Sequence, residues 1–272
     1  MKGYNFINLF KGLGLFLLQL AVVYFIVESG LSAGAKFPLV ILALGAVVFV
    51  SFKLDCWKEM AVFGMFYTII AGFLMPVPRL PIVNETIRNQ YFHVAMWMAM
   101  VIVLFASALH AVKYLRKGDL RDDILSSEFA NLGLVFGVLG IITGMVWANY
   151  TWGKPWHGDP KQVSAAIGLL VYFALMVLRS SFNDDVKRAR IGAVYNLFAF
   201  PLMIVLLFTV PRMYDSLHPG AGGNPAFGKA DLDNTMRMVF YTAIIAWTLL
   251  GVWIATLRIR TRLLELKVYD VL

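Results

Sequence analysis

The chain has 272 residues, of which 60% are hydrophobic and only 15% are charged, and its formal net charge is +8. Soluble globular domains carry nearer a quarter charged residues, so this composition excludes an ordinary soluble domain and indicates a protein of the lipid bilayer. The basic residues lie in short segments between apolar runs, which is typical of a polytopic membrane protein and argues against a nucleic-acid partner. The single cysteine, Cys56, excludes an internal disulfide and a CxxC motif.

Eight apolar segments are long enough, or nearly so, to cross about 30 Å of hydrocarbon, which takes roughly 20 helical residues. They lie at 12–30, 37–53, 60–76, 91–114, 129–150, 163–181, 190–211 and 236–257. No segment shows the alternation of a strand. We therefore predict an all-α, polytopic transmembrane helical bundle of about eight spans. The first two spans form a tight hairpin, and nothing in it repeats later in the chain.

The N-terminal segment also resembles a signal peptide. Lys2 and Lys11 precede its apolar run, and the small residues Ala33-Gly34-Ala35 follow it. The run of about 18 residues is long for a signal peptide and adequate for a span. We therefore predict an uncleaved first helix, and cleavage would leave the later loops on the same faces.

Lys and Arg alternate between richer and poorer loops along the chain. The richer segments are the N-terminus, the C-terminal tail and the loops at 53–59, 113–128 and 179–190. By the positive-inside rule these segments face the cytoplasm, so both termini are predicted to be cytoplasmic. The three long loops that remain then share the outer face. They lie at about 76–90, 151–162 and 211–235.

The outer loop at 151–162 contains the run Thr151-Trp152-Gly153-Lys154-Pro155-Trp156-His157-Gly158-Asp159-Pro160. Two further histidines belong to the same predicted face, since His93 opens the fourth span and His218 lies in the last outer loop. His110 lies 17 residues beyond His93 on the same predicted helix. That separation is about 25 Å at 1.5 Å per residue, which places His110 near the inner end.

Aromatic planes, imidazoles and cations at one membrane surface suit haem. Its iron takes neutral imidazole ligands, its porphyrin packs on aromatic faces, and its propionates bind cations. Asp159 would either hold an imidazole by its second nitrogen or pair with a lysine at the rim. The aromatic candidates are Trp152, Trp156, Tyr150 and Phe92. The cationic candidates are Arg88, Lys154, Lys161, Arg212 and Arg237.

Each of these residues also has an ordinary interpretation. A tryptophan at a membrane boundary is usually an interfacial anchor, and a single loop histidine is commonly solvated. Arg88 near a helix start is typical of lipid headgroup binding, and His110 is interpreted as a boundary or packing residue. The remaining tryptophans are interpreted as anchors or packing residues. These are Trp97, Trp147, Trp247 and Trp253.

Residues from about 60 to 265 resemble the CcmC family, the haem exporter protein C of bacterial cytochrome c maturation. Val83–Val94 resembles the family segment that enters the helix with the first external histidine. Trp152-Gly153-Lys154-Pro155 followed by Trp156, Gly158 and Asp159 resembles the family's tryptophan-rich "WWD" loop. Ser216-Leu217-His218 resembles the second external histidine segment, with Met236-Arg237 after it.

The resemblance implies a haem-handling membrane protein rather than an enzyme. His93 and His218 would be the axial ligands of the iron of haem b, with the tryptophan loop as a platform between them. Trp152, Trp156, Asp159, Arg88, Lys161 and Arg237 would complete the site. The protein would hand haem to a CcmE-like chaperone in the bacterial inner membrane, with its site facing the periplasm. Its other partners would be CcmA/CcmB-type ABC transporter subunits and a CcmD-like small protein; this chain has no GxxxxGK[ST] motif of its own.

The chain departs from the family pattern at several points. Its tryptophan loop is shorter, Lys161 stands where the family commonly has an arginine, and His157 has no family counterpart. Family members typically have six spans, so the resemblance implies an additional hairpin at 1–55 and a haem-handling domain at 56–272.

Two other functions fit parts of the sequence. A cytochrome c haem lyase of the CcsA type would need two further histidines within the membrane, and only His110 is available. A small-solute transporter would need charged residues within spans or broken helices at mid-membrane, and the sequence shows neither.

Overall fold

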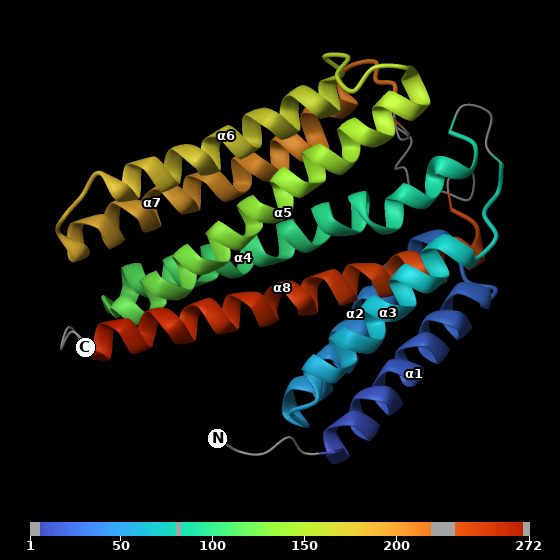
Figure 1. Ribbon diagram of the computed structural model, residues 1–272, viewed down its shortest axis with the longest axis horizontal. Coiled ribbons are helices and arrows are strands. Elements are labelled where there is room, and N and C mark those ends of the chain that lie inside the picture. The colour runs from blue at the N-terminus through green and yellow to red at the C-terminus, as the bar shows by residue number, and fades with distance from the viewer. Residues whose placement is uncertain (1–5, 80–82, 219–231, 269–272) are drawn as a thin grey trace. The chain divides into compact units, whose positions relative to one another are not determined.

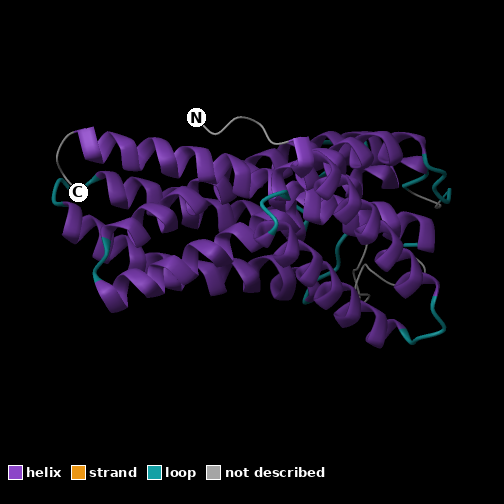
Figure 2. Ribbon diagram, turned by 90° about the horizontal axis from the view of Figure 1, so that it is seen from below, coloured by secondary structure: helices purple, strands orange, loops and turns teal. Residues whose placement is uncertain are grey.

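The computed structural model describes residues 6–79, 83–218 and 232–268. Within these ranges the long elements are all helices, and Figure 2 shows only helices joined by loops. They are α1 (Phe6–Glu28), α2 (Ala33–Lys53), α3 (Trp57–Leu74), α4 (His93–Lys117), α5 (Leu120–Trp152), α6 (Pro160–Ser180), α7 (Asp185–Ile204) and α8 (Asn234–Val268) (Figure 1). In the part of the chain that is described, eight helices are long and apolar enough to cross a membrane. The prediction of an all-α polytopic bundle with about eight spans is confirmed.

Three consecutive helices of the bundle begin at an aspartate. Asp119, Asp159 and Asp184 are the N-cap residues of α5, α6 and α7, and each carboxylate accepts a backbone N–H of the first turn. Such caps satisfy donors that a helix leaves unpaired at its start. The aspartates therefore determine where the chain turns back into the bilayer.

The seventh span changes its winding before it ends. Pro201 lacks the N–H that an α-helix needs, and α7 ends three residues later at Ile204. The chain continues as a π-helical turn, η2 (Val205–Thr209), and a 3-10 turn, η3 (Val210–Arg212). The predicted span at 190–211 thus exists, with its last turns wound differently, and it leads directly to Ser216–His218.

The described chain divides into two compact units. Unit 1 comprises 1–95 and 227–250, and unit 2 comprises 96–226 and 251–272. The predicted N-terminal hairpin, α1 and α2, belongs to unit 1, where α1 packs against both α2 and α3. The boundary at residue 55 comes from the resemblance and stays a prediction.

Unit 2 pairs its buried polar side chains with one another. Asn196 on α7 donates to the hydroxyls of Ser107 and Ser126 at 2.7 and 3.0 Å, and the Tyr172 hydroxyl donates to its carbonyl oxygen at 3.5 Å. Nearby, Arg179 forms two hydrogen bonds to Asp123, at 2.7 and 2.8 Å. Because hydrocarbon offers no partner to a polar group, these bonds hold α4, α5, α6 and α7 in one arrangement.

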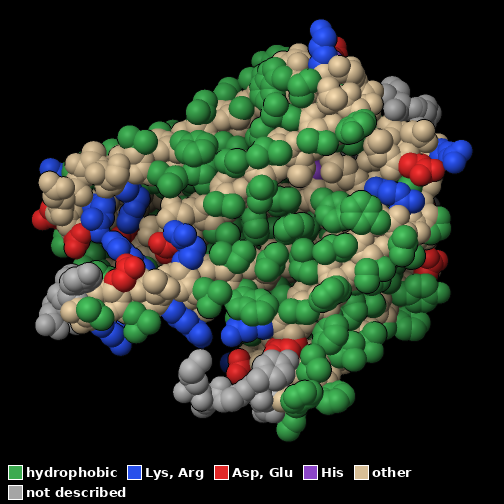
Figure 3. Space-filling view, in the orientation of Figure 1, with side chains coloured by type: hydrophobic (Ala, Val, Ile, Leu, Met, Phe, Trp, Pro, Cys, Tyr) green, Lys and Arg blue, Asp and Glu red, His purple; other side chains and the backbone are tan. Residues whose placement is uncertain are grey.

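Basic side chains gather at one end of unit 2. Figure 3 shows Lys and Arg over the ends of the helices at the side where the chain terminates in Figure 1. The α4–α5 and α6–α7 connections lie there, and the α5–α6 connection lies at the opposite end (Figure 1). Within unit 2, the loops that are rich in Lys and Arg therefore lie at one end and the α5–α6 loop lies at the other, as the alternation of charge along the sequence predicts. Which face is cytoplasmic stays a prediction.

Arg179→Met is expected to destabilise the protein by about 3–5 kcal/mol, because the Asp123 carboxylate would stay buried without its cation. The double variant Asp123→Leu/Arg179→Met should recover most of that loss, since no buried charge remains. Thermal unfolding in detergent, followed by helical circular dichroism, measures both. Arg258→Met, which removes the more exposed pair with Glu128, is the control and should cost at most about 1 kcal/mol. Equal losses in the single and double variants would contradict the ion pair as the cause.

Candidate functional site

The loop between α5 and α6 has a conformation set by its own residues. Gly153 ends α5 with φ +79° and Gly158 has φ +69°, values that glycine adopts without strain. The Gln162 side chain then ties the loop together. Its carbonyl oxygen accepts the His157 N–H at 2.9 Å, and its amide donates to the Pro155 carbonyl at 3.1 Å. The loop is therefore held against the first turn of α6.

Asp159 is the centre of the candidate site. Its side chain is 1% exposed, and it accepts the Lys161 N–H at 2.9 Å as the N-cap of α6. The same carboxylate accepts the Ser216 hydroxyl, the Leu217 N–H at 2.7 Å and the His218 ring nitrogen Nδ1 at 2.8 Å. One buried carboxylate thus binds the segment that follows η3 to the start of α6, two segments that lie together in Figure 1.

The charge of Asp159 follows from these partners. Burial alone would raise the pKa of this carboxyl. The hydrogen bond and positive charge of His218, together with the N–H groups of Leu217 and Lys161, outweigh burial and hold the pKa of Asp159 well below its usual range. The carboxylate is ionised at neutral pH, and the positive end of the α6 dipole favours the same state.

An ionised carboxylate at Nδ1 defines the tautomer of His218. When the ring is neutral, its proton lies on Nδ1, where Asp159 accepts it, and Nε2 keeps a lone pair. This carboxylate–imidazole pair is the arrangement found behind many metal-binding histidines, where the carboxylate orients the ring and increases its basicity. His218 is therefore prepared to donate Nε2 to a metal centre.

Tryptophan rings surround the His218 imidazole. The Trp152 ring centroid lies 4.8 Å from it in an edge-on arrangement, and the Trp147 centroid lies 6.0 Å away. The two indoles also contact each other, at 5.0 Å. The His157 ring also contacts Trp152, with 5.9 Å between the two ring centroids. The imidazole thus has apolar, flat neighbours and one anionic partner.

Sequence reasoning anticipated part of this cluster. Trp152, Asp159 and His218 lie in contact, and of the two alternatives for Asp159 the structure shows the imidazole contact. Trp147 and Ser216 also touch the cluster; Trp147 was interpreted as an anchor or packing residue, and Ser216 received no role of its own. Only the return of 213–218 onto the end of α5 shows that they belong there.

Other candidates of unit 2 lie elsewhere or take part through their backbone. Trp156 is 40% exposed and Tyr150 is 79% exposed. Lys161 contributes its N–H to Asp159, and Arg212 donates to the Phe208 carbonyl one turn earlier. Residues 219–231 of the predicted third outer loop lie outside the described residues.

His93, Arg88 and Arg237 belong to unit 1. The Arg88 guanidinium donates to the carbonyls of Gly72 and Met75 and so ends α3. His93 is half-buried at the first residue of α4. Arg237 is 8% exposed, and its Nε donates to the Leu232 carbonyl at 3.1 Å. Both arginines are thus anchored by backbone oxygens, Arg88 at the end of α3 and Arg237 at the start of α8.

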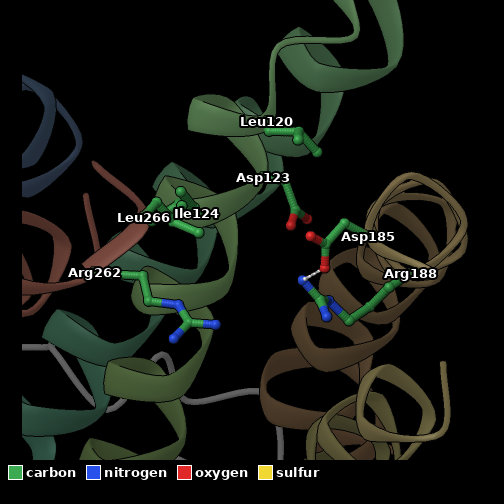
Figure 4. A pocket seen from close by; sticks show the side chains of 7 residues that line it. All are labelled: Leu120, Asp123, Ile124, Asp185, Arg188, Arg262 and Leu266. Carbon is green, nitrogen blue, oxygen red and sulfur yellow. Dashed lines mark ion pairs between the residues drawn. The ribbon is translucent and has the colours of Figure 1, made fainter. Parts of the chain in front are cut away.

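A small pocket lies at the basic end of unit 2 (Figure 4). Its volume is about 60 Å³. Arg188 pairs with Asp185, Arg262 with Glu265 and Asp123 with Arg179, so neighbouring residues already balance its charges. It holds no imidazole and lies at the other end of unit 2 from Asp159. Its lining residues are Leu120, Asp123, Ile124, Asp185, Arg188, Arg262 and Leu266.

The eight apolar helices of the described ranges, together with an imidazole oriented by a buried carboxylate among tryptophans, define a multi-pass membrane protein with a candidate metal-ligand site. The chain belongs to the heme exporter protein C family, whose model matches residues 47–271. The match begins within α2, so α1 and the first part of α2 lie outside it. The family resemblance of the sequence is confirmed.

Several relatives are similar to this chain. Heme exporter protein C of Bradyrhizobium diazoefficiens is 27% identical over 186 residues, which cover 68% of this chain and 70% of that protein. Heme exporter protein C of Haemophilus influenzae is 24% identical, with 67% of this chain and 73% of that protein covered. The cytochrome c biogenesis protein CcsA of Daucus carota is 37% identical over 96 residues, which are 35% of this chain and 29% of that protein. The similarity to CcsA is therefore local.

Asp159→Asn keeps the shape of the side chain and removes the charge to which His218 donates. We expect the free energy of unfolding to fall by about 1–3 kcal/mol near neutral pH. The folded-state pKa of Asp159 lies below the unfolded value of about 3.9. The wild-type advantage is therefore complete above that value and is lost as pH falls toward the folded-state pKa. Denaturant unfolding of both proteins from about pH 7 to pH 3 measures this difference in the free energy of unfolding. A difference that stays constant as the pH falls would contradict the role of the charge.

Proposed function

We propose that this protein binds haem at the outer face of the bacterial inner membrane during cytochrome c maturation and delivers it to a haem chaperone. The observation that carries the proposal is the His218–Asp159 pair at 2.8 Å, which leaves imidazole Nε2 available beside Trp152. Membership of the heme exporter protein C family supports haem as the cargo. The site would then face the periplasm.

The iron is held by imidazole in this proposal. His218 is one axial ligand, and Asp159 keeps its ring in the correct tautomer. His93 is the second axial ligand, a role that rests on its place in the segment resembling the family. Two neutral imidazoles suit haem b, whose iron then has no open coordination position. The protein would carry its cargo without activating oxygen.

The porphyrin plane and its propionates require different neighbours. Trp152 and the exposed Trp156 provide flat apolar surface in the tryptophan loop. Arg88, Arg237 and Lys161 are the proposed propionate partners. A guanidinium has five N–H donors, so an arginine anchored by a carbonyl keeps others for a carboxylate.

Delivery of haem to the chaperone would depend on how this protein positions the porphyrin. With the iron held by histidines and the tryptophan loop over one part of the porphyrin, the vinyl edge would be presented to the nucleophilic side chain of a CcmE-like chaperone. This chain would contribute proximity rather than acid–base chemistry, so we propose that it is not an enzyme. CcmA/CcmB-type ABC subunits and a CcmD-like protein are the proposed partners in the same membrane.

Visible spectroscopy of the purified protein tests the haem site. Wild type co-expressed with the chaperone should show the spectrum of low-spin haem with two histidine ligands. His218→Ala and His93→Ala should each lose that spectrum and most of the bound haem, because one axial ligand is removed. His157→Ala is the matched control in the same loop cluster and should keep it. A wild-type protein without this spectrum would contradict the proposal.

A haem lyase of the CcsA type is the second candidate, and the local similarity to CcsA proteins favours it. His110 supports it further, because its Nδ1 lies 2.7 Å from Asp122 and its ring stacks on Phe129. A small-solute transporter is less well supported. The buried charged residues among those described, Asp123, Asp159 and Arg237, lie near helix starts rather than at mid-membrane.

His110→Phe separates haem handling from the lyase candidate. A protein that receives haem without help from the inner histidine should keep its haem content and its spectrum within about twofold of wild type. Haem per protein, measured by pyridine haemochrome assay, reports the outcome. Complete loss of haem in folded His110→Phe protein would favour the lyase, which needs histidines within the membrane.

A further inference from the structure

Ser216 takes part in the candidate site twice through one hydroxyl. Its Oγ donates to the Asp159 carboxylate, whose two oxygens lie 3.0 and 2.9 Å away. The same oxygen accepts the backbone N–H of His218 at 3.1 Å. Because the His218 ring nitrogen Nδ1 also donates to Asp159, at 2.8 Å, the three residues form a closed cycle of hydrogen bonds. Ser216 thus connects the backbone of His218 to the carboxylate that orients its ring.

The Asp159 carboxylate is shared among several donors. A carboxylate offers about four lone-pair positions for hydrogen bonds. Among the described residues, its donors are the Ser216 hydroxyl, the N–H groups of Lys161 and Leu217, and Nδ1–H of His218. The Asp159 side chain is 1% exposed, so bulk water adds little to this set. The His218 ring therefore receives only part of the accepting capacity of the carboxylate.

The strength of the Asp159–His218 hydrogen bond determines how the imidazole behaves as a ligand. A carboxylate at Nδ1 draws on the ring proton and makes Nε2 a stronger electron donor. Every further donor to the carboxylate stabilises its negative charge, so it draws less on that proton. Lys161 and Leu217 use backbone N–H groups, which no side-chain substitution removes. Ser216 uses a hydroxyl, so this position can adjust the bond while both of its partners stay in place.

We propose that Ser216 is a positioning residue of this site, which limits how strongly Asp159 polarises His218. By donating to the carboxylate, its hydroxyl weakens the hydrogen bond from Nδ1–H and lowers the electron donation of Nε2. By accepting the His218 N–H, it keeps the backbone in the local turn that brings the ring to Asp159. The effect on the Asp159–His218 bond is a property of the haem-free protein. The effect on iron rests on the proposed function.

A limited donor strength suits a protein that delivers what it binds. An imidazole whose Nδ1 proton is strongly drawn to a carboxylate becomes a more basic ligand. Such a ligand holds ferric iron more tightly, since the more oxidised ion gains more from electron donation. A protein that hands its haem to a chaperone has to release this bond. The Ser216 hydroxyl would therefore keep His218 oriented without making it too strong a ligand.

Ser216→Ala in the haem-free protein tests the hydrogen bond itself. With the competing donor removed, the Nδ1 proton resonance of His218 should move downfield in NMR of protein labelled with 15N-histidine, at a pH where the 15N shifts show a neutral ring. Ser216→Cys, a weaker donor, should give a smaller shift in the same direction. Ser216→Thr keeps the hydroxyl and should keep the wild-type resonance. His218→Ala assigns the signal by its loss.

Thr151→Val is the matched control in the same cluster, because the Thr151 hydroxyl donates to the Trp147 carbonyl and not to Asp159. It should leave the His218 resonance in place. A resonance that is unmoved, or that moves upfield, in both Ser216→Ala and Ser216→Cys would overturn the proposal. This outcome is independent of whether the protein binds haem.

The reduction potential of the haem-loaded protein tests the consequence for the ligand. Ser216→Ala should keep the low-spin spectrum and shift the potential to more negative values, since a tenfold gain in the preference for ferric iron corresponds to about 59 mV. Ser216→Thr should keep the wild-type potential. A purely structural role would loosen His218, so a more positive potential with high-spin haem would overturn the proposal.

Failure of the proposed function has a different signature. A wild type that binds no haem would contradict that function alone, because the haem-free resonance still decides the role of Ser216. A resonance that moves downfield in Ser216→Ala, together with an unchanged potential in the loaded protein, would contradict His218 as a ligand of the iron. It would support the control of the Asp159–His218 bond by Ser216.

Discussion

The candidate site depends on one carboxylate. Asp159 begins α6 and also receives the hydroxyl, N–H and imidazole groups of Ser216, Leu217 and His218. Removing water from a charged group is costly unless several hydrogen bonds replace it, and here donors from two distant segments do so. The same contacts that keep Asp159 ionised also set the tautomer of His218, so helix capping, loop placement and ligand orientation share a single cause.

The two units treat buried polarity differently. In unit 2, Asn196 joins Ser107, Ser126 and Tyr172, and Asp123 pairs with Arg179. These contacts give the buried polar atoms hydrogen-bond partners and keep α4, α5, α6 and α7 in one arrangement. In unit 1, donors on three helical elements are buried without partners among the described residues. A fully paired polar network makes the surrounding helices rigid, and in unit 2 these are the helices that carry Asp159.

Much of the architecture was predictable because hydrophobic length is a local property. Every predicted span corresponds to a long helix, and the family resemblance rested on short segments that the chain keeps in order. Trp147 was interpreted as an anchor or packing residue, because a tryptophan within a span gives no local sign of which residues it contacts. Its contact with His218 joins residues 71 positions apart, which no local pattern reports. Ser216 was passed over for the same reason.

The sequence by itself determined the class of the protein, since an apolar run of about 20 residues has few alternatives to a membrane helix. It also singled out Trp152, Asp159 and His218 as residues whose chemistry suits a haem ligand site. Only the tertiary structure decided that Asp159 binds His218 rather than a lysine, and that Trp147 closes the cluster. The reason is physical: a buried carboxylate takes whichever donors the fold brings to it, and side-chain type alone does not specify which those are.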